Sequence, residues 1–328
     1  MRVLVTGAGG YIGSVLVRML LQEGHEVVAV DRFLFGREVL PDQAHGLTVL
    51  QEDIRRLQSE VLESVDAVVD LAALSNDPSG ELDPERTWEV NHRARVRLAR
   101  ISKDTGVRRY ILPSSCSVYG FQQGWLDESS SVSPLTTYAK ANLQAERDVL
   151  PLASADFCVV VIRQATVYGY SPRMRFDLAI NGMVRGFFRN GRIPILRDGT
   201  QWRPFVHVRD TCRAMLLLLE APRELVNGEI FNVGSDDQNV QILPLARRVA
   251  EAIGVPFQYE WYGLPDHRSY RVSFRKITER LGYRTTQTVE DGVREVYQAL
   301  KEGHVDPDDP RTITVSWYKH LIEKGVPL

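Results

Sequence analysis

The sequence is poor in the residues that bind metals or build disulfide frameworks. It has three cysteines, Cys116, Cys158 and Cys212, and seven histidines in 328 residues. The cysteines are too few and too scattered for a disulfide framework or a zinc cluster, and the histidines show no metal-ligand spacing. This usage fits a reducing compartment best, and we expect a cytoplasmic protein with no metal site.

The chain also lacks an excess of charge and a long hydrophobic run. Its formal net charge is −2, which gives no electrostatic footprint for nucleic acid or for an anionic membrane surface. No apolar run approaches the length that spans a bilayer, and residues 1–7 (MRVLVTG) resemble a strand instead of a cleavable signal. We therefore expect no nucleic-acid or membrane partner and a small molecule as the ligand.

What the chain does contain is enough apolar sequence for a sizeable core. Hydrophobic residues make up 44% and charged residues 25% of the chain, as in ordinary globular proteins. Short β-branched runs predict buried strands at residues 3–6, 27–31, 47–50, 67–71, 110–113 and 159–163. Between several of these runs lie helical patterns, as at residues 12–20. The alternation predicts an α/β fold with a Rossmann-type doubly wound parallel sheet.

After Tyr168 the alternation weakens into loops, with helices predicted near residues 177–189 and 211–220. This change predicts a smaller C-terminal substrate-binding lobe. We expect an NAD-binding domain over residues 1–165, with later segments around 205–235 rejoining it, and a mainly substrate-binding lobe over residues 166–328. The acidic, proline-containing stretch 306–311 predicts a surface loop.

Glycines occupy the turn after the first predicted strand. Residues 6–13 read TGAGGYIG, which places Gly7, Gly10 and Gly13 between a strand and an amphipathic helix. Glycine is needed where a tight turn requires unusual dihedrals and where the backbone approaches a pyrophosphate and a neighbouring strand. The following helix N-terminus offers free N–H groups to the anion. The segment predicts a dinucleotide-binding turn, with a purely structural turn as the alternative.

The second predicted strand ends on Asp31. At this distance downstream a carboxylate accepts hydrogen bonds from the adenosine ribose hydroxyls and repels a 2′-phosphate, which favours NAD over NADP. The neighbouring Arg32 can pair with such a phosphate and soften the preference. The alternative for Asp31 is a turn residue at a strand end.

Further motifs, in their order and spacing, resemble those of the extended short-chain dehydrogenases/reductases. This is the NAD-dependent nucleotide-sugar epimerase/dehydratase family, which includes UDP-galactose 4-epimerase and GDP-fucose synthase. The resemblance covers nearly the whole chain. It rests on the glycine turn, Asp53-Ile54, Leu71-Ala72-Ala73, Asn91, residues 114–120 (SSCSVYG), Tyr138, residues 163–169 (RQATVYG), residues 203–208 (RPFVHV) and residues 231–234 (FNVG).

The resemblance implies a set of cofactor contacts. In this family the pair at 53–54 holds the adenine, the segment 71–73 passes beneath the pyrophosphate, and the double-serine strand end lies beside the nicotinamide. The residues expected to bind NAD are Gly7, Gly10, Tyr11, Ile12, Gly13, Asp31, Arg32, Asp53, Ile54, Leu71, Ala72, Ala73, Asn91, Ser114, Tyr138 and Asn142.

The resemblance also implies the catalytic pair. A tyrosinate removes the proton of a sugar hydroxyl while a hydride leaves the same carbon, and a serine or threonine hydrogen-bonds the oxygen. Tyr138 and Ser115 match these roles. Because a tyrosine titrates near ~10 in water, a working base needs positive charge nearby. The family supplies it with the nicotinamide ring and a lysine four residues after the tyrosine.

This chain has Asn142 at the position of that lysine. Lys140 is a tempting substitute, but residues two apart on a helix are separated by roughly 200° of rotation, so Lys140 should point away from Tyr138. Asn142 can hydrogen-bond the nicotinamide ribose but supplies no charge. We predict a higher tyrosine pKa and slower chemistry than in a lysine-bearing relative.

The residues after Ser115 bear on the reaction. Dehydratases of the family have acidic residues there, whereas this chain has Cys116 and Ser117, which are poor acid–base groups for elimination. GDP-fucose synthase has a catalytic cysteine one residue later than Cys116. A catalytic role for Cys116 stays open beside the alternative of a small packed side chain.

With no dehydratase acids, the simplest chemistry is oxidation at a sugar carbon, rotation of the ketone and reduction on its other face. The sequence thus favours an NAD-dependent epimerase of a nucleotide-activated sugar. A net reductase or dehydrogenase of a nucleotide-linked keto sugar is the first alternative. A non-catalytic NAD or nucleotide-sugar binding protein is the second, because Asn142 replaces the lysine.

Three residues are expected on the substrate side. Thr166 occupies a position where relatives often have an asparagine that touches the sugar nucleotide. Arg203 and Arg268 lie in segments that face the nucleotide diphosphate in the family, and a guanidinium suits bidentate phosphate binding. Each arginine can instead form a surface ion pair. The resemblance also implies a homodimer formed through two helices per subunit, the one after Tyr138 and the one near residues 91–102.

Overall fold

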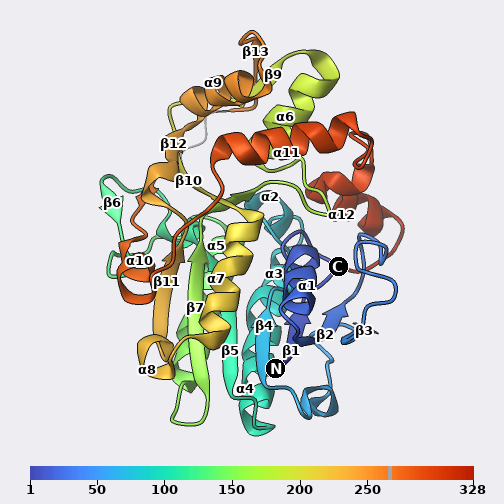
Figure 1. The fold of residues 1–328 in the computed structure, drawn as a ribbon, viewed down its shortest axis with the longest axis vertical. Helices are drawn as coiled ribbons and strands as arrows, with labels where there is room; N and C mark the ends of the chain where they lie inside the picture. The colour runs from blue at the N-terminus through green and yellow to red at the C-terminus, as the bar shows by residue number, and fades with distance from the viewer. Residues whose placement is uncertain (265–267) are drawn as a thin grey trace.

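The computed structural model describes residues 1–264 and 268–328. Its centre is a parallel seven-stranded sheet with the strand order β11-β7-β5-β4-β1-β2-β3 (Figure 1). This order identifies a doubly wound sheet and confirms the predicted fold class. The strands are β1 (Arg2–Thr6), β2 (Glu26–Asp31), β3 (Leu47–Gln51), β4 (Ala67–Asp70), β5 (Arg109–Ser115), β7 (Cys158–Gln164) and β11 (Glu229–Val233).

Helices cover both faces of this sheet. Successive residues of a strand point to opposite faces. Val3 and Val5 of β1 therefore join one core cluster, with α1 (Gly13–Gln22) and α7 (Val208–Glu220). Leu4 joins the other, with α4 (Arg95–Asp104) and α5 (Thr137–Val149). Burial on both faces explains why these strands are continuous apolar runs.

One long helical stretch crosses the second face. It consists of α3 (Pro84–Trp88), the π-helical segment η2 (Glu89–Ala94) and α4. A π-helical turn inserts an extra residue into a helix and so changes the direction in which the following side chains point. Here Asn91 lies within that turn and Arg95 directly follows it.

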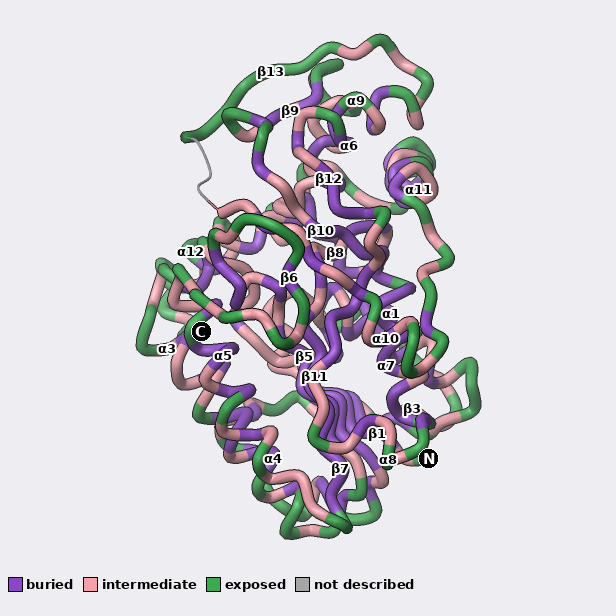
Figure 2. The backbone as a smooth tube through the Cα atoms, turned by 90° about the vertical axis from the view of Figure 1, so that its left-hand side faces the viewer, coloured by how far each residue is buried: buried purple, intermediate pink, exposed green. Residues whose placement is uncertain are grey.

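A second lobe lies beyond the carboxyl ends of the sheet strands (Figure 1). It contains α6 (Ala179–Asn190), α9 (Ile242–Ile253), α11 (Val289–Lys301) and the parallel pair β9 (Ile193–Leu196) and β13 (Tyr259–Tyr262). A sheet of β8 (Thr166–Tyr168), β10 (Trp202–His207) and β12 (Asn239–Gln241) lies between the lobes. The chain then returns to the large sheet through β11. In Figure 2 the strands of the large sheet are mostly buried, whereas β13 is exposed.

Short elements complete the chain. They are α2 (Asp77–Gly80), β6 (Trp125–Leu126), α8 (Arg223–Val226), β14 (Arg271–Val272), α10 (Arg275–Leu281) and α12 (Thr314–Glu323). Residues 306–311 lead into α12, whose existence the sequence patterns did not predict. Within residues 1–264 and 268–328, no helix has the length and apolar character needed to cross a membrane.

Candidate active site

A cavity of about 980 Å³ opens where β1, β2, β4 and β5 end, and it extends into the second lobe. In a parallel sheet these carboxyl ends share one edge, so residues far apart in sequence converge there. All residues predicted to bind the cofactor line this cavity except Asn91 and Asn142. The predicted substrate contacts Ser115, Thr166, Arg203 and Arg268 also line it.

The glycine turn has no room for side chains. Gly7 has a φ of +63°, and a Cβ built on it would lie 2.7 Å from the carbonyl carbon of Leu71. A Cβ on Gly13 would lie 2.1 Å from the carbonyl oxygen of Gly7. The first glycine therefore allows the turn to approach the loop after β4, and the last allows α1 to pack against the turn. This backbone cradle suits a pyrophosphate at the start of α1.

Asp31 ends β2 at the rim of this cradle. Its carboxylate accepts hydrogen bonds from the backbone N–H of Gly9 at 2.9 Å and of Phe33 at 2.6 Å. Burial raises the pKa of Asp31, and these two hydrogen bonds oppose the rise. Arg32 donates to the carbonyl oxygen of Pro327 at 2.5 Å, and its Nε lies 3.7 Å from Asp53. The residues around the cradle thus fit the ribose end of a dinucleotide, with Arg32 held by the C-terminal segment.

The two predicted cofactor residues outside the cavity wall lie directly behind it. Asn91 is fully buried and forms two hydrogen bonds with the backbone of Leu74, at 2.8 and 3.1 Å. It therefore fixes the loop that lines the cavity. Asn142 is 2% exposed and is hydrogen-bonded to Arg95 and to the backbone of Tyr138. A direct contact of either residue with NAD stays a prediction, and the geometry gives both a positioning role.

Sequence reasoning missed the C-terminal part of the cofactor site. Tyr318 of α12 and Leu328 are both 3% exposed and line the cavity. Tyr318 packs on Phe35, with ring centroids 5.4 Å apart. Arg173 also lines the cavity and stacks on the Phe35 ring, with its guanidinium carbon 3.7 Å from the ring centre. α12 thus forms a wall beside the cradle.

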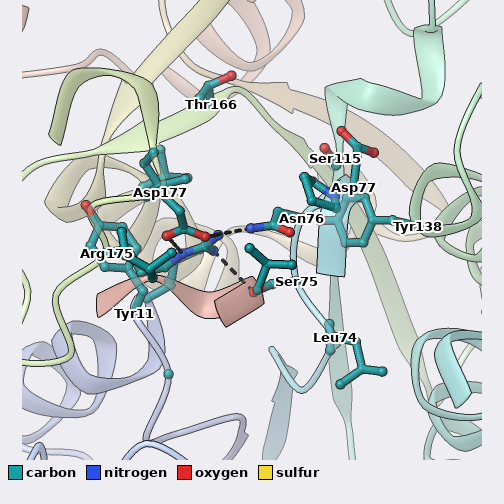
Figure 3. Close-up of a pocket in the computed structure, with 18 of the residues that line it drawn as sticks. Tyr11, Leu74, Ser75, Asn76, Asp77, Ser115, Tyr138, Thr166, Arg175 and Asp177 are labelled. Carbon is teal, nitrogen blue, oxygen red and sulfur yellow. Dashed lines mark hydrogen bonds and ion pairs between the residues drawn. The ribbon is translucent and has the colours of Figure 1, made fainter. Parts of the chain in front are cut away.

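Ser115 and Tyr138 lie together at the opposite part of the cavity (Figure 3). Ser115 is the last residue of β5, and Tyr138 lies in the first turn of α5. Thr136 caps α5 by accepting a hydrogen bond from Ala139 N–H at 3.2 Å, and its hydroxyl donates to Asp77. The same cap therefore fixes both Tyr138 and the carboxylate of Asp77, which the sequence analysis had not singled out.

The charges around Tyr138 act in opposite directions. Burial raises the pKa of its phenol, and the carboxylate of Asp77 raises it further. The guanidinium groups of Arg95 and Arg175 and a hydrogen bond with Ser115 lower that pKa, but the net shift is upward. The upward shift comes from burial and from Asp77, so the comparison with a lysine-bearing relative stays a prediction.

Lys140 does not take the place of the missing lysine. It is exposed on α5 and is absent from the cavity wall, whereas Tyr138 lines it. The rotation between the two positions explains this difference. Asn142 shares the face of Tyr138 but is turned inward, toward Arg95.

The two residues after Ser115 have different surroundings. Cys116 is 1% exposed within an apolar cluster, and its thiol donates to the carbonyl oxygen of Arg163 at 3.3 Å. Burial raises the pKa of this thiol. Ser117 lines the cavity, and its buried hydroxyl has no hydrogen-bond partner in the described part of the chain. The geometry favours the packing role for Cys116 and places Ser117, but not Cys116, in the cavity wall.

The substrate side contains charged groups from both lobes. Arg268 forms an ion pair with Asp77, and Arg203 lies over the ring of Tyr270, its guanidinium carbon 5.3 Å from the ring centre. A network that the sequence did not reveal crosses the cavity (Figure 3). In it Arg175 binds Asp177 at 2.8 Å and Ser75 at 3.2 Å, and Asn76 binds Asp177 at 2.6 Å. Nowhere in the described ranges do three or more metal-binding side chains gather.

A doubly wound sheet with a glycine turn, an acidic strand end and a serine–tyrosine pair on one edge defines a dinucleotide-dependent enzyme. The sequence pattern of the NAD dependent epimerase/dehydratase family matches residues 3–234, and the chain belongs to this family. The resemblance to the extended short-chain dehydrogenases/reductases is thereby confirmed.

Several relatives are similar over nearly their whole length. An uncharacterized UDP-glucose epimerase, YtcB, of Bacillus subtilis strain 168 is 27% identical over 311 residues, 89% of this chain and 96% of the relative. MoeE5, solved in complex with UDP-glucuronic acid and NAD, is 31% identical with a TM-score of 0.83, covering 92% of this chain and 100% of its own. DesIV, a dTDP-glucose 4,6-dehydratase from Streptomyces venezuelae solved with NAD, is 27% identical with a TM-score of 0.82, covering 94% and 99%. These relatives include an epimerase and a dehydratase, so similarity alone does not select the reaction.

Proposed function

We propose that this protein is an NAD-dependent epimerase of a nucleotide-activated sugar that works through a transient keto intermediate. The observation that carries the proposal is the pair Ser115 and Tyr138 in the cavity wall, followed by a buried Cys116 and by Ser117 where an elimination would need acids. The pair can move a proton at a sugar hydroxyl, whereas a thiol with a raised pKa and a hydroxyl are poor groups for expelling water.

The chemistry divides between the cofactor and the chain. Bound NAD supplies the hydride acceptor and later returns the same hydride. Tyr138, as the phenolate, removes the proton from the reacting hydroxyl, and Ser115 hydrogen-bonds that oxygen as the C–H and O–H bonds break and the C=O bond forms. After the ketone has turned its other face, Tyr138 gives the proton back. The sugar is inverted at one carbon, with no net oxidation.

The substrate side supports a nucleoside diphosphate sugar as the ligand. Arg203 and Arg268 line the cavity on the side of the second lobe, where guanidinium groups suit a diphosphate. Thr166 offers a hydroxyl to the same space. MoeE5, the solved relative with 31% identity, binds UDP-glucuronic acid, which makes UDP-sugars the first compounds to test.

The test is turnover of separate UDP-, GDP-, CDP- and dTDP-sugars with NAD, followed by the anomeric signals in proton NMR and by NADH absorbance. We expect new anomeric signals without lasting NADH. The matched control is Y138F, which should bind NAD but convert no sugar. Conversion of the sugar by the Y138F protein at the rate of the original protein, or signals of a dehydrated keto sugar, would contradict an epimerase that uses this pair.

Two alternatives have observations in their favour. A net reductase or dehydrogenase uses the same serine–tyrosine pair, and it would change NADH in proportion to the sugar converted. A non-catalytic NAD or nucleotide-sugar binding protein is supported by Asn142 in place of the lysine. It would bind the panel without converting any member.

We also propose a homodimer formed through α4 and α5. The outward faces of these helices carry exposed charged residues of both signs, such as Lys103, Asp104 and Arg147, so the interface would be polar. Light scattering coupled to size-exclusion chromatography tests this proposal, and a dimer that dissociates at high salt is the expected result.

A further inference from the structure

A cation is buried directly behind the catalytic pair. Arg95 is 1% exposed, and it begins α4 immediately after the π-helical segment η2. Burying a guanidinium is costly unless its charge and its donors are satisfied. Arg95 lies on α4, and this helix packs against α5, which carries Tyr138.

The guanidinium of Arg95 is hydrogen-bonded to the sheet on one side and to α5 on the other. Its Nε donates to the carboxylate of Asp70 at 3.2 Å, and its Nη2 donates to the backbone oxygens of Asp70 and Pro113. Its Nη1 donates to Oδ1 of Asn142 at 2.9 Å. The carboxylate of Asp70 is also held by the hydroxyls of Thr6 at 2.6 Å and Tyr110 at 2.7 Å. The counter-charge is therefore fixed toward the sheet, and the Nη1 end of the cation is directed at α5.

Asn142 connects this cation to the catalytic tyrosine. Its Oδ1 accepts from Arg95, and its Nδ2 donates to the carbonyl oxygen of Tyr138 at 3.0 Å. An asparagine side chain has both an acceptor and a donor, whereas a lysine has donors only. A lysine at position 142 would bring a second positive charge against Arg95 and would leave Nη1 without its acceptor. An arginine at 95 and a lysine at 142 are thus mutually exclusive arrangements.

We propose that Arg95, held by Asn142, supplies from α4 the positive charge that a lysine on α5 supplies in related enzymes, and that Asn142 is the residue that positions it. Arg95 acts on Tyr138 through space and through Asn142, so it is a positioning and charge-supplying residue. The role of the Arg95 charge in catalysis rests on the function proposed above.

The groups that face Tyr138 from the other elements leave this role to Arg95. Asp77 of α2 is negative and raises the pKa of Tyr138, while Arg95 lowers that pKa more than Arg175 does. Arg175 comes from the second lobe and is paired with Asp177. Ser115 of β5 contributes a neutral hydroxyl. Arg95 is therefore the cation on the side of α5 where the lysine would otherwise lie.

The experiment is a near-ultraviolet difference titration of Tyr138, obtained by subtracting the Y138F protein from the matching Tyr138 protein, with NAD added to both. R95Q should raise the pKa of Tyr138 by about one unit, because a nearby cation is lost. R95K should shift it less. N142D keeps Arg95 but places a carboxylate against Nη1, and it should raise the same pKa. The double variant R95Q/N142K rebuilds the lysine arrangement and should return the pKa toward its original value.

R95Q and N142D test the inference independently, so it stays testable even if one of these variants does not fold. R95Q leaves Asp70 without its cation and risks instability, whereas N142D is nearly isosteric and leaves the Arg95–Asp70 pair intact. A folded R95Q or N142D protein in which Tyr138 titrates as in the original chain overturns the proposal. A merely structural Arg95 would change stability without moving this titration.

The titration is independent of turnover, so the two proposals fail separately. If no nucleotide sugar is converted but R95Q and N142D shift the pKa, the proposed function fails and the charge relationship stands. If sugars are converted and neither variant shifts the pKa or the pH–rate profile, the inference fails alone.

Discussion

Tyr138 and Lys140 stand two residues apart on α5, and only Tyr138 lines the cavity. Removing the phenol hydroxyl in Y138F should lower turnover by about 10²–10⁴-fold, the usual contribution of a positioned acid–base group, and leave NAD affinity nearly unchanged. The exposed neighbour provides the matched control, and K140A should retain turnover. Initial rates by NMR and NAD binding by calorimetry measure both variants. A K140A protein as inactive as Y138F would show that Lys140 has the role here assigned to other groups.

The acidic neighbour of Tyr138 leads to a pH prediction. In the proposed mechanism the base is the deprotonated phenol of Tyr138, and its pKa is raised first by burial and then by Asp77. The rate should therefore still rise with pH above neutrality, since only a small fraction of Tyr138 is ionised there. In D77N one negative charge is gone, so the pKa should fall and the rate profile should move to lower pH by about one unit.

Rates measured across the pH range, at saturating sugar and NAD, check this prediction. E81Q is a suitable control, because Glu81 binds the start of α5 at Thr137 and is not one of the main charges that shift the pKa of Tyr138. A rate already on its plateau at neutral pH in the original chain would contradict the raised pKa.

At the residue scale, the sequence predicted what local patterns determine and missed what tertiary packing brings together. Gly7 follows β1, Asp31 ends β2 and Ser115 ends β5, so the parallel direction of these strands alone places the three residues on one edge of the sheet. Asp77 and Arg95 belong to no such pattern. Their approach to Tyr138 depends on a capping threonine and on a π-helical turn, and neither leaves a recognisable signature in a single sequence.

The turn between β1 and α1 allows a clean test of the cofactor cradle. Gly7 and Gly191 have nearly the same φ, +63° and +66°, but a Cβ meets the backbone of Leu71 at 2.7 Å in the first and nothing within 4 Å in the second. G191A should cost only the strain of a left-handed alanine, about 1–2 kcal/mol, and keep NAD binding. G7A should lower NAD affinity by at least about tenfold, equivalent to about 1.4 kcal/mol, because the turn and the Leu71 loop must separate.

Calorimetric titration with NAD and thermal unfolding of both variants separate the two effects. Equal losses of NAD affinity in G7A and G191A would mean that the left-handed backbone alone, and not the close approach, explains the glycine at position 7.

The position of α12 in the cavity wall leads to a second prediction at the scale of elements. Tyr318 of α12 is buried in the cavity wall beside Phe35, whereas Ile322 on the same helix is 45% exposed. Y318A should open the wall and lower NAD affinity by about tenfold. I322A should leave the affinity unchanged. Fluorescence or calorimetric titration with NAD measures both, and an unchanged affinity in a folded Y318A protein would remove α12 from the cofactor site.

The elements differ in how far the sequence predicted them. All six predicted runs correspond to strands of the large sheet. Burial on both faces leaves a continuous apolar signal in the inner strands, whereas β3 at the edge is only partly buried. The strands β8 and β12 between the lobes, and β9 and β13 in the second lobe, are only three or four residues long, and none is buried throughout, so they lack a continuous apolar run. α12 follows a stretch that resembles a surface loop, and its contacts with Leu34 and Phe35 in the loop after β2 depend on tertiary packing.

The two lobes share one hydrophobic core. The cluster that contains Val3 and Leu16 of the sheet domain also contains Met183, Leu245 and Val293 of the second lobe. The chain also crosses between the lobes more than once, since β11 returns to the large sheet after β9 and β10. A continuous core with repeated crossings should behave as one cooperative unit.

The hydrophobic core that the two lobes share leads to a prediction for thermal unfolding. We expect a single calorimetric transition for the whole chain, although the predicted NAD contacts lie mainly at the sheet edge. At about one hundred times its Kd, NAD should stabilise the folded chain by about 2.7 kcal/mol and move the entire transition upward. The G7A protein is the control, since its weakened cradle should show little shift at the same NAD concentration. Two separate transitions, of which NAD moves only one, would show that the lobes unfold independently and that the shared core does not couple the cofactor site to the substrate side.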